Sequence, residues 1–123
     1  MMAQPLEPRR AWIDDWLMGT DPTREALLAR AFVDIFRRFW MAEGLGERSR
    51  STRRRHSGGL HALGGYLVSR GLEPEHTERT AHELLWEAVE LDEGPLIFWD
   101  NEAWQDELDT TCRRLRRYLE KGN

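Results

Sequence analysis

The chain has 123 residues, enough for one domain, 1–123, with a buried core, and it carries a net charge of −4. A hydrophobic share of 40% and a charged share of 33% are typical of a globular protein. The single cysteine, Cys112, excludes an internal disulfide framework and a cysteine-ligated zinc site, and no apolar run approaches the ~18 residues of a membrane span. Because the first residues also lack the apolar region of a signal peptide, we expect a cytoplasmic protein with no membrane partner.

The charge is unevenly divided along the chain. Residues 1–72 carry 12 basic and 8 acidic side chains, a net +4, whereas residues 73–123 carry 6 basic and 14 acidic side chains, a net −8. The two halves can therefore attract one another, either within one molecule or between two copies.

The chain begins with a lead, residues 1–7, that we expect to be loosely ordered. Pro8 suits the first turn of a short helix that runs to about Met18 and is closed by Gly19. Its apolar face is formed by Trp12, Ile13, Trp16 and Leu17.

The next helix has the clearest signals in the chain. Asp21 supplies a cap and Pro22 suits the first turn, so we predict a helix that runs to about Ala42 and ends at Gly44. Apolar residues recur along it at the helical period, and we assign this aromatic-rich stripe to the core rather than to a surface for stacking bases. The stripe consists of Leu27, Leu28, Ala31, Phe32, Ile35, Phe36, Phe39 and Trp40.

The glycine-rich stretch 51–70 is predicted to be the central helix, with a cap at Ser51 or Thr52 and Gly71 after its end. One side carries leucines, and the other carries small residues that would let a neighbouring backbone approach closely. The leucines are Leu60, Leu63 and Leu67, and the small residues are Gly58, Ala62, Gly65 and Ser69. The alternative is a kink or break at one of the Gly-Gly pairs, 58–59 or 64–65.

Arginines crowd the start of this helix, although the helix dipole makes cations unfavourable there by about 0.3 kcal/mol or more each. The same geometry suits an anion, because free backbone N–H groups lie beside guanidinium groups. The functional interpretation is a site for phosphate or an acidic partner, and the interpretation we favour is a solvated charge run neutralised by the protein's own acidic half. The candidate residues are Arg48, Arg50, Arg53, Arg54, Arg55 and His56.

The fourth helix has two candidate starts. Pro74 suits a first turn, whereas Thr80 would cap the helix in a capping box with Glu83. We expect Glu87 and Glu90 on its exposed side. Its apolar residues are Ala81, Leu84, Leu85, Ala88, Val89 and Leu91.

The apolar run 96–99 lies between turn signals, and we predict a buried connection rather than a strand because it has no partner strand. Asp100 or Asn101 would cap the last helix, which ends near Glu120. Its apolar stripe consists of Trp104, Leu108, Thr111, Cys112, Leu115, Tyr118 and Leu119. Its last turns carry basic residues that complement the dipole as in an ordinary helix end: Arg113, Arg114, Arg116 and Arg117.

These elements predict an all-α fold, a compact bundle of about five helices around the central helix at about 51–70, with no sheet. Ten side chains are predicted to lie in its core. They are Trp16, Phe32, Ile35, Phe39, Leu60, Leu63, Leu67, Leu85, Leu108 and Leu115.

The sequence presents no catalytic constellation. The four histidines include no pair at a spacing of three or four, and the segment beginning at His82 does not complete a zinc-binding helix motif. Carboxylates are abundant between residues 73 and 109 without any pair standing out, and Cys112 lies on an apolar stripe as a buried, inert thiol would. We therefore predict a non-enzymatic protein with no catalytic residue, no metal and no cofactor.

One stretch resembles a known module. From F-R-R-F-W-M-A-E-G-L-G to L-H-A-L-G-G-Y-L, residues 36–67, the chain resembles the helical core-binding module of tyrosine recombinases: a helix ending in an aromatic residue and G-L, then a Ser- or Thr-capped helix with a basic residue and leucines. The recombinase catalytic domain has no counterpart. Residues 52–66 and G-P-L-I-F-W-D-N-E-A-W-Q-D-E-L-D-T-T-C-R-R-L, 94–115, are similar to small uncharacterised bacterial proteins associated with mobile elements. These resemblances imply a bacterial cytoplasmic protein with a binding role near DNA.

Two functions are predicted from different classes. The first is a protein-interaction or assembly module, in which the +4 and −8 halves guide pairing with a partner protein or with a second copy. The second is an accessory protein that makes weak nucleic-acid contacts, binding phosphates through the arginines from Arg48 to Arg55.

Overall fold

The computed structural model describes residues 7–122 and shows the all-α fold that the sequence predicts. Within these residues five α-helices and two 3₁₀ turns follow one another, and no residue lies in a strand. The helices are α1 (Ala11–Asp15), α2 (Pro22–Ala42), α3 (Arg50–Arg70), α4 (Ala81–Val89) and α5 (Glu102–Glu120), and the turns are η1 (Leu45–Glu47) and η2 (Pro74–His76). All of the lead except Glu7 lies outside the described residues.

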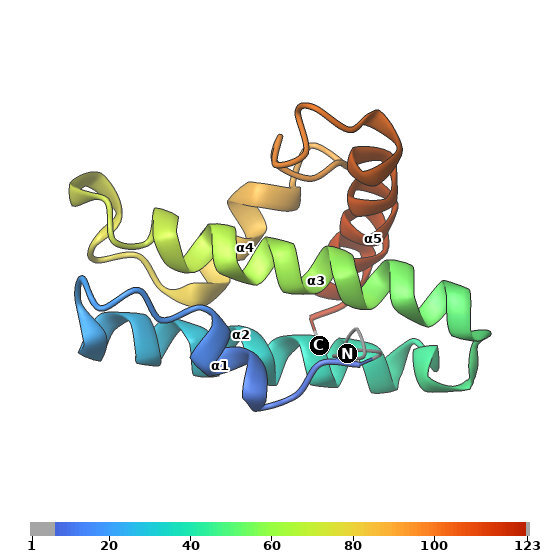
Figure 1. Cartoon of the computed structure of the whole chain (residues 1–123), viewed down its shortest axis with the longest axis horizontal. Coiled ribbons are helices and arrows are strands. Elements are labelled where there is room, and N and C mark those ends of the chain that lie inside the picture. Colours follow the sequence, from blue (N-terminus) through green and yellow to red (C-terminus); the bar gives the residue numbers. More distant parts are fainter. Residues whose placement is uncertain (1–6, 123) are drawn as a thin grey trace.

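The glycine-rich helix α3 is central, as predicted. It runs antiparallel to α2, and α5 crosses it on the other side (Figure 1). α1 lies against α2, and α4 packs against α5. Because α3 contacts both α2 and α5, the core forms on two of its sides.

Side-chain caps fix the starts of four helices, and those of α2, α4 and α5 are at predicted positions. Asp21 accepts the backbone N–H of Arg24, with Pro22 in the first turn of α2, as predicted. Thr80 and Glu83 form the expected capping box at α4, while Pro74 opens the separate turn η2. At α5 the cap is Asn101, whose side chain accepts the N–H of Trp104 at 3.1 Å. Local capping chemistry therefore sets these boundaries.

The start of α3 differs from the prediction. Its cap is Ser49, whose hydroxyl accepts the backbone N–H of Thr52 at 3.3 Å, so Ser51 and Thr52 lie inside the first turn. The helix then runs without a break through both Gly-Gly pairs to Arg70. The alternative of an interruption at 58–59 or 64–65 is therefore wrong.

All ten predicted core side chains are buried, with at most 6% of each exposed. They belong to one cluster that joins every α-helix. Five further large side chains are fully buried in it: Trp12, Leu28, Phe36, Leu45 and Leu84. The helical period of the apolar residues thus identified these ten correctly, but it also placed Leu27 in the α2 core stripe, and Leu27 is 62% exposed.

The predicted small-residue side of α3 is only partly right. Gly58 and Ser69 are exposed, and a Cβ on Gly58 would meet no atom within 4 Å. The glycines that a neighbour approaches closely are Gly59, Gly64 and Gly65, of which only Gly65 lies on the predicted side. A Cβ on Gly64 would overlap the indole of Trp16, so the absence of a side chain there allows α1 to pack against α3.

The first helix is shorter than the predicted span from Pro8 to about Met18. α1 ends at Asp15, and Trp16 follows as its cap. The backbone N–H groups of residues 18–21 donate instead to the carboxylate of Glu25.

Two adjacent residues at the start of α2 hold the neighbouring loops. The carboxylate of Glu25 is fully buried and accepts the backbone N–H groups of residues 18–21 at 2.9–3.1 Å. These hydrogen bonds, led by the one from Asp21, lower the pKa of Glu25 in spite of its burial. On the other side, Arg24 donates at 2.8–3.3 Å to the carbonyl groups of Gly71, His76 and Arg79.

The connection 96–99 is not the buried segment that its apolar residues predict. Leu96 and Trp99 are 69% and 79% exposed, while Ile97 and Phe98 are half-buried. The N–H groups of Ile97 and Phe98 bond the side-chain oxygen of Gln105 at 3.1 and 3.0 Å. The segment is therefore a tethered loop that turns two large apolar side chains outward, and it forms no strand, as expected.

The expectation that Glu87 faces solvent is also wrong. Its carboxylate is half-buried and forms ion pairs with Arg70, at 3.0 Å, and with Arg79. Glu90 is exposed, as predicted. One acidic residue of the negative half is thus used to fasten α4 to the end of α3.

Within residues 7–122, no helix combines the length and the apolar character that crossing a bilayer would require.

Candidate functional site

The arginine cluster, defined as Arg48, Arg50, Arg53, Arg54 and Arg55, lies around the N-terminal end of α3. Four of its members are exposed, and Arg53 is half-buried with a buried Nε that lacks a hydrogen-bond partner. Within the described part of the chain, none of the five forms an ion pair. The cluster therefore presents positive charge to solvent.

Of the acidic half, Asp106 and Glu107 lie near Arg55 without an ion pair to it, and other carboxylates have other partners. Asp92 lies 3.8 Å from Arg116, and the backbone carbonyl of Glu90 accepts from the same guanidinium at 3.1 Å. Arg114 pairs with Glu43 at 3.1 Å. The arginines of α5 thus fasten the fold, as an ordinary helix end would.

His56 belongs to the core rather than to the positive surface. It is 6% exposed, and its Nδ1 lies 2.8 Å from the hydroxyl of Thr111. That hydroxyl donates to the backbone carbonyl of Glu107 at 3.2 Å, so we assign the proton of the His56–Thr111 bond to Nδ1. Burial, together with the charges of Arg114 and then Arg55, lowers the pKa of His56 to about 4. The ring is neutral near pH 7 and adds no positive charge to the cluster.

A groove runs beside the arginine cluster, between α3 and the start of α5, and we call it the α3–α5 groove. Its volume is about 640 Å³. The α3 wall consists of Ser51, Arg54, Arg55, Gly58 and Gly59. The opposite wall consists of Phe98, Trp104, Glu107 and Leu108. Cationic, aromatic and glycine surfaces therefore meet in one concavity.

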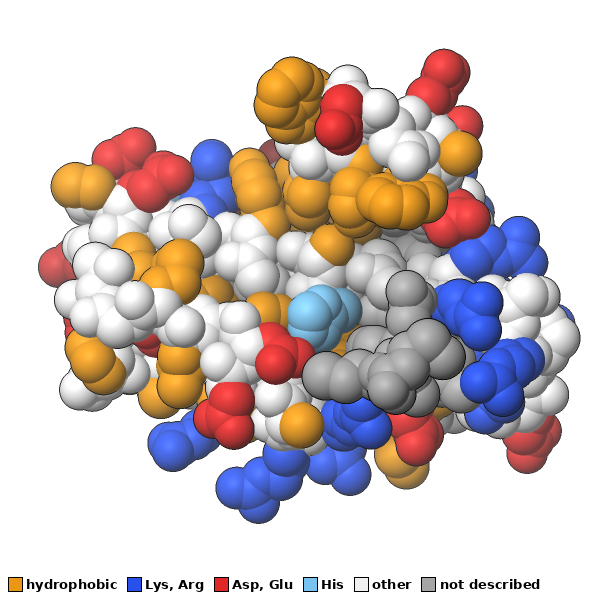
Figure 2. Space-filling model, viewed as in Figure 1, with side chains coloured by type: hydrophobic (Ala, Val, Ile, Leu, Met, Phe, Trp, Pro, Cys, Tyr) orange, Lys and Arg blue, Asp and Glu red, His pale blue; other side chains and the backbone are white. Residues whose placement is uncertain are grey.

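The aromatic wall of this groove continues onto an exposed apolar surface. Trp104, predicted as part of the buried stripe, is 57% exposed and packs edge-on against Phe98 with ring centroids 5.6 Å apart. Trp99 and Leu96 extend this surface along the preceding loop. Figure 2 shows hydrophobic side chains gathered over this loop and the start of α5, with basic side chains at the end of the molecule where α3 begins.

A smaller pocket of about 310 Å³ adjoins the groove and shares Arg55 and Glu107 with it. Thr52, Asp106 and Thr110 also line this pocket. The combined surface is consequently not purely basic, because two carboxylates lie on its α5 side. Such a surface can bind a ligand of mixed charge better than a uniform polyanion.

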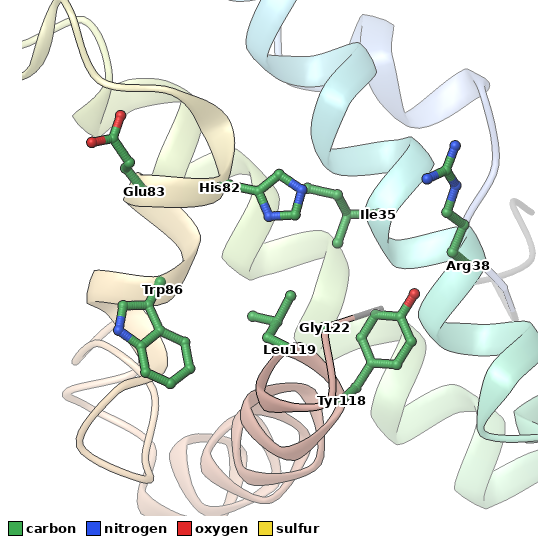
Figure 3. Close-up of a pocket in the computed structure, with 8 residues that line it drawn as sticks. All are labelled: Ile35, Arg38, His82, Glu83, Trp86, Tyr118, Leu119 and Gly122. Carbon is green, nitrogen blue, oxygen red and sulfur yellow. The ribbon is translucent and has the colours of Figure 1, made fainter.

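A second large hollow, of about 540 Å³, lies between α2, α4 and the end of α5. In Figure 3 the side chains of Ile35, Tyr118 and Leu119 point toward its centre, whereas Glu83 points away. Its charged groups have other roles, since Glu83 caps α4 and Arg38 pairs with Asp34 at 3.2 Å. The imidazole of His82 also points inward, but no charged group is directed at it, so the hollow has fewer convergent polar groups than a ligand site usually has.

Three potential metal ligands also lie together. Glu73, Glu75 and His76 bring ligand atoms within 4.8 Å of one another. Histidine spacing does not reveal this cluster, because it contains only one histidine. Both carboxylates are exposed on a surface turn. Exposed acidic groups commonly gather in this way, so the cluster does not by itself define a metal centre.

Cys112 is a buried thiol, as its place on the apolar stripe predicts. Burial, and then the charge of Asp109, raises the pKa of Cys112 to about 12. It therefore remains protonated near pH 7 and is a poor nucleophile.

The sequence located the arginines of the α3–α5 groove but not its aromatic wall. Trp104 falls at the helical period of the α5 stripe, and only its position in the first turn hinted that it lies beyond the core. The turn residues around 96–99 were a similar hint, because short loops between Gly-Pro and Asp-Asn tend to lie at the surface.

Comparisons with protein-family models, with curated proteins and with solved structures find no match for this chain.

Proposed function

We propose that this protein is a non-enzymatic interaction module, and that the α3–α5 groove with its exposed aromatic rim is the surface that binds a partner protein. The observation that carries the proposal is the position of Trp104, 57% exposed, in one groove with the unpaired Arg54 and Arg55, while Trp99, 79% exposed, extends the apolar surface on the preceding loop. Tryptophan and arginine are the residues most enriched among those that dominate binding energy in protein interfaces.

The cost of exposing these side chains supports the same function. A fully exposed tryptophan forgoes about 2–3 kcal/mol of burial energy, and two of the six tryptophans of this small chain are more than half exposed in adjacent segments. A partner that covers them would recover that energy on binding. We also propose a cytoplasmic location, because a lone protonated thiol is compatible with a reducing compartment.

Site-specific photocrosslinking in the cell of origin tests this proposal. A benzophenone amino acid at Ser51, on the groove wall, should give discrete protein adducts that disappear when Trp104→Ala is added. The matched control is Thr23, an exposed residue on α2. If Ser51 gives no adduct beyond those of Thr23, the groove is not a docking surface. An adduct of twice the chain mass would identify a second copy as the partner.

A second candidate function is favoured by the arginine cluster itself. Five neighbouring arginines without ion pairs in the described chain can contact phosphates, and we propose weak nucleic-acid binding as the alternative function. A gel-shift titration tests it, because two or three phosphate contacts would give a slope of log affinity against log salt of about −2 to −3. Exchange of Arg53, Arg54 and Arg55 for Ala should then abolish the shift, and the absence of any shift with the parent protein rejects this function.

A further inference from the structure

We propose that the natural occupant of the α3–α5 groove is a short helix of a partner protein that carries an apolar anchor flanked by carboxylates. This inference rests on the proposed function, since it names the chemistry of the partner that the groove would bind.

The first argument is charge complementarity. Arg54 and Arg55 line the groove, are exposed, and have no ion-pair partner in the described chain. By contrast, Arg70 and Arg79 share the carboxylate of Glu87 elsewhere on the molecule. The repulsion between neighbouring guanidinium groups and the helix dipole favours an anionic group at this position. Carboxylates on the partner would provide it without any change in the fold.

The second argument is the shape and polarity of the groove. Gly58 is exposed on α3 here, and no atom lies within 4 Å of the place where its Cβ would be, whereas the adjoining Gly59 faces Thr111. Opposite them, Trp104 and Leu108 provide an apolar wall. An apolar side chain can therefore enter between the indole and the glycine backbone. Glycines on one helix also allow a second helix to approach closely.

The third argument is length. From Ser51 to Gly59 the α3 wall extends about 12 Å, which matches about two turns of an opposing helix. On a helix, carboxylates three or four residues from an apolar anchor lie on the same face as that anchor. A two-turn helix can thus place its anchor against Trp104 and its acids against Arg54 and Arg55.

The carboxylates near the groove favour such a peptide over a nucleic acid. Glu107 is half-buried on the α5 wall, and Asp106 lines the adjoining pocket. A phosphate chain that followed the groove would pass these groups, and the net charge of −4 adds long-range repulsion. A peptide instead carries its acids at selected positions and can direct an amide or a lysine toward Glu107.

The inference is tested by selection from a display library of random peptides about 12 residues long, which is roughly three helical turns. The full-length parent chain is the bait, and the Trp104→Ala variant is used to remove peptides that bind elsewhere. We expect the surviving peptides to be enriched in Asp and Glu beside one large apolar residue. Their affinity, measured by fluorescence polarisation, should fall about tenfold in the double variant Arg54→Ser with Arg55→Ser, and should weaken with salt. The control Arg117→Ser, an exposed arginine at the far end of α5, should leave it unchanged.

The outcomes separate this inference from the proposed function. Peptides that need Trp104 but show no acidic enrichment would overturn the inference and leave the groove as a docking surface. If no peptide depends on the groove, both proposals fail. If an oligothymidylate competes with the peptides at Trp104 and binds more tightly than they do, the occupant of the groove is a nucleic acid and the inference is overturned. A parent dimer in sedimentation analysis that dissociates in Trp104→Ala would make a second copy the occupant and would also overturn the inference.

Discussion

The two Gly-Gly pairs of α3 have the same sequence and opposite surroundings. At Gly64 a side chain would overlap Trp16, and Gly65 lies against the edge of the same indole. At Gly58 there is open space, and only Gly59 meets a neighbour, the hydroxyl of Thr111 at 3.2 Å from its Cβ position. The pair Gly64-Gly65 is therefore required for internal packing, whereas Gly58 contributes nothing to the packing of this chain.

This difference separates stability from binding along one helix. A glycine inside a helix costs about 0.5–1 kcal/mol relative to alanine, and at Gly64 the close packing of Trp16 offsets that cost. No contact within the described chain offsets it at Gly58, which instead forms part of the α3–α5 groove. Sites that break local rules without an internal gain are good candidates for function.

The largest effect is expected where the glycine is covered. Gly64→Val should destabilise the fold by about 3 kcal/mol, because Trp16 must leave its position between α1 and α3. Urea unfolding followed by circular dichroism measures the loss. A variant within about 0.5 kcal/mol of the parent would mean that α1 is not firmly packed on α3.

The next effect concerns the buried histidine beneath the open end of α3. The pKa of His56 is about 4 in the folded chain and near 6.5 when unfolded, so the unfolded chain takes up the proton first. Stability should thus be complete above pH 6.5 and decline, on the order of 2 kcal/mol, as the pH falls to about 4.

Thermal melts across this pH range provide the test, with His56→Gln as the control. The slope between pH 6.5 and 4.5 should be absent in that variant, whatever its absolute stability. Below that interval, protonation of Glu25, whose pKa is lowered, destabilises both proteins. An equal slope in parent and control would assign the acid sensitivity to other groups.

A smaller effect of opposite sign is expected at the open glycine. Gly58→Ala should stabilise the fold by about 0.5–1 kcal/mol, because alanine favours the helix and its methyl group meets no atom within 4 Å. The same substitution should weaken any ligand that uses the groove floor. Parallel melts of Gly58→Ala and Gly64→Ala make the comparison directly, and a loss of stability in both would contradict it.

The smallest effect comes from the arginines at the same end. Arg54→Ala and Arg55→Ala should each raise stability by about 0.3 kcal/mol at low salt, since they remove positive charge near the positive end of the dipole. The gain should vanish at high salt. As a matched control, Arg114→Ala should lower stability because it breaks the ion pair with Glu43. Destabilisation by the first two substitutions would reveal internal pairing of the cluster.

Much of the fold was predictable from local chemistry. The Asp21-Pro22 start and the Thr80–Glu83 box are complete within four residues of sequence, and both form as expected. The core residues recur at the helical period, so burial follows from spacing alone. Leu63 is an example, with no exposed surface.

The remaining features depend on tertiary contacts that leave little trace in the sequence. A glycine has no side chain to indicate its partner, so the sequence does not distinguish the covered pair Gly64-Gly65 from the pair that contains the open Gly58. A glutamate in a first turn is usually solvated, yet Glu25 is fully buried because a loop wraps its carboxylate. Tryptophan is a common core residue, yet Trp99 is 79% exposed, on a loop that Gln105 of α5 ties down through the N–H groups of Ile97 and Phe98. The arginines were located by sequence, but their lack of internal partners required the fold.

The paired anchors Arg24 and Glu25 link loops that are far apart in the sequence. Glu25 accepts hydrogen bonds from the amides of residues 18–21, and Arg24 donates to backbone carbonyls across residues 71–79. Both side chains come from the first turn of α2. If that turn frays, both loops lose their anchors together. Their backbone hydrogens should therefore exchange with solvent as one cooperative unit, although one loop follows α1 and the other follows α3.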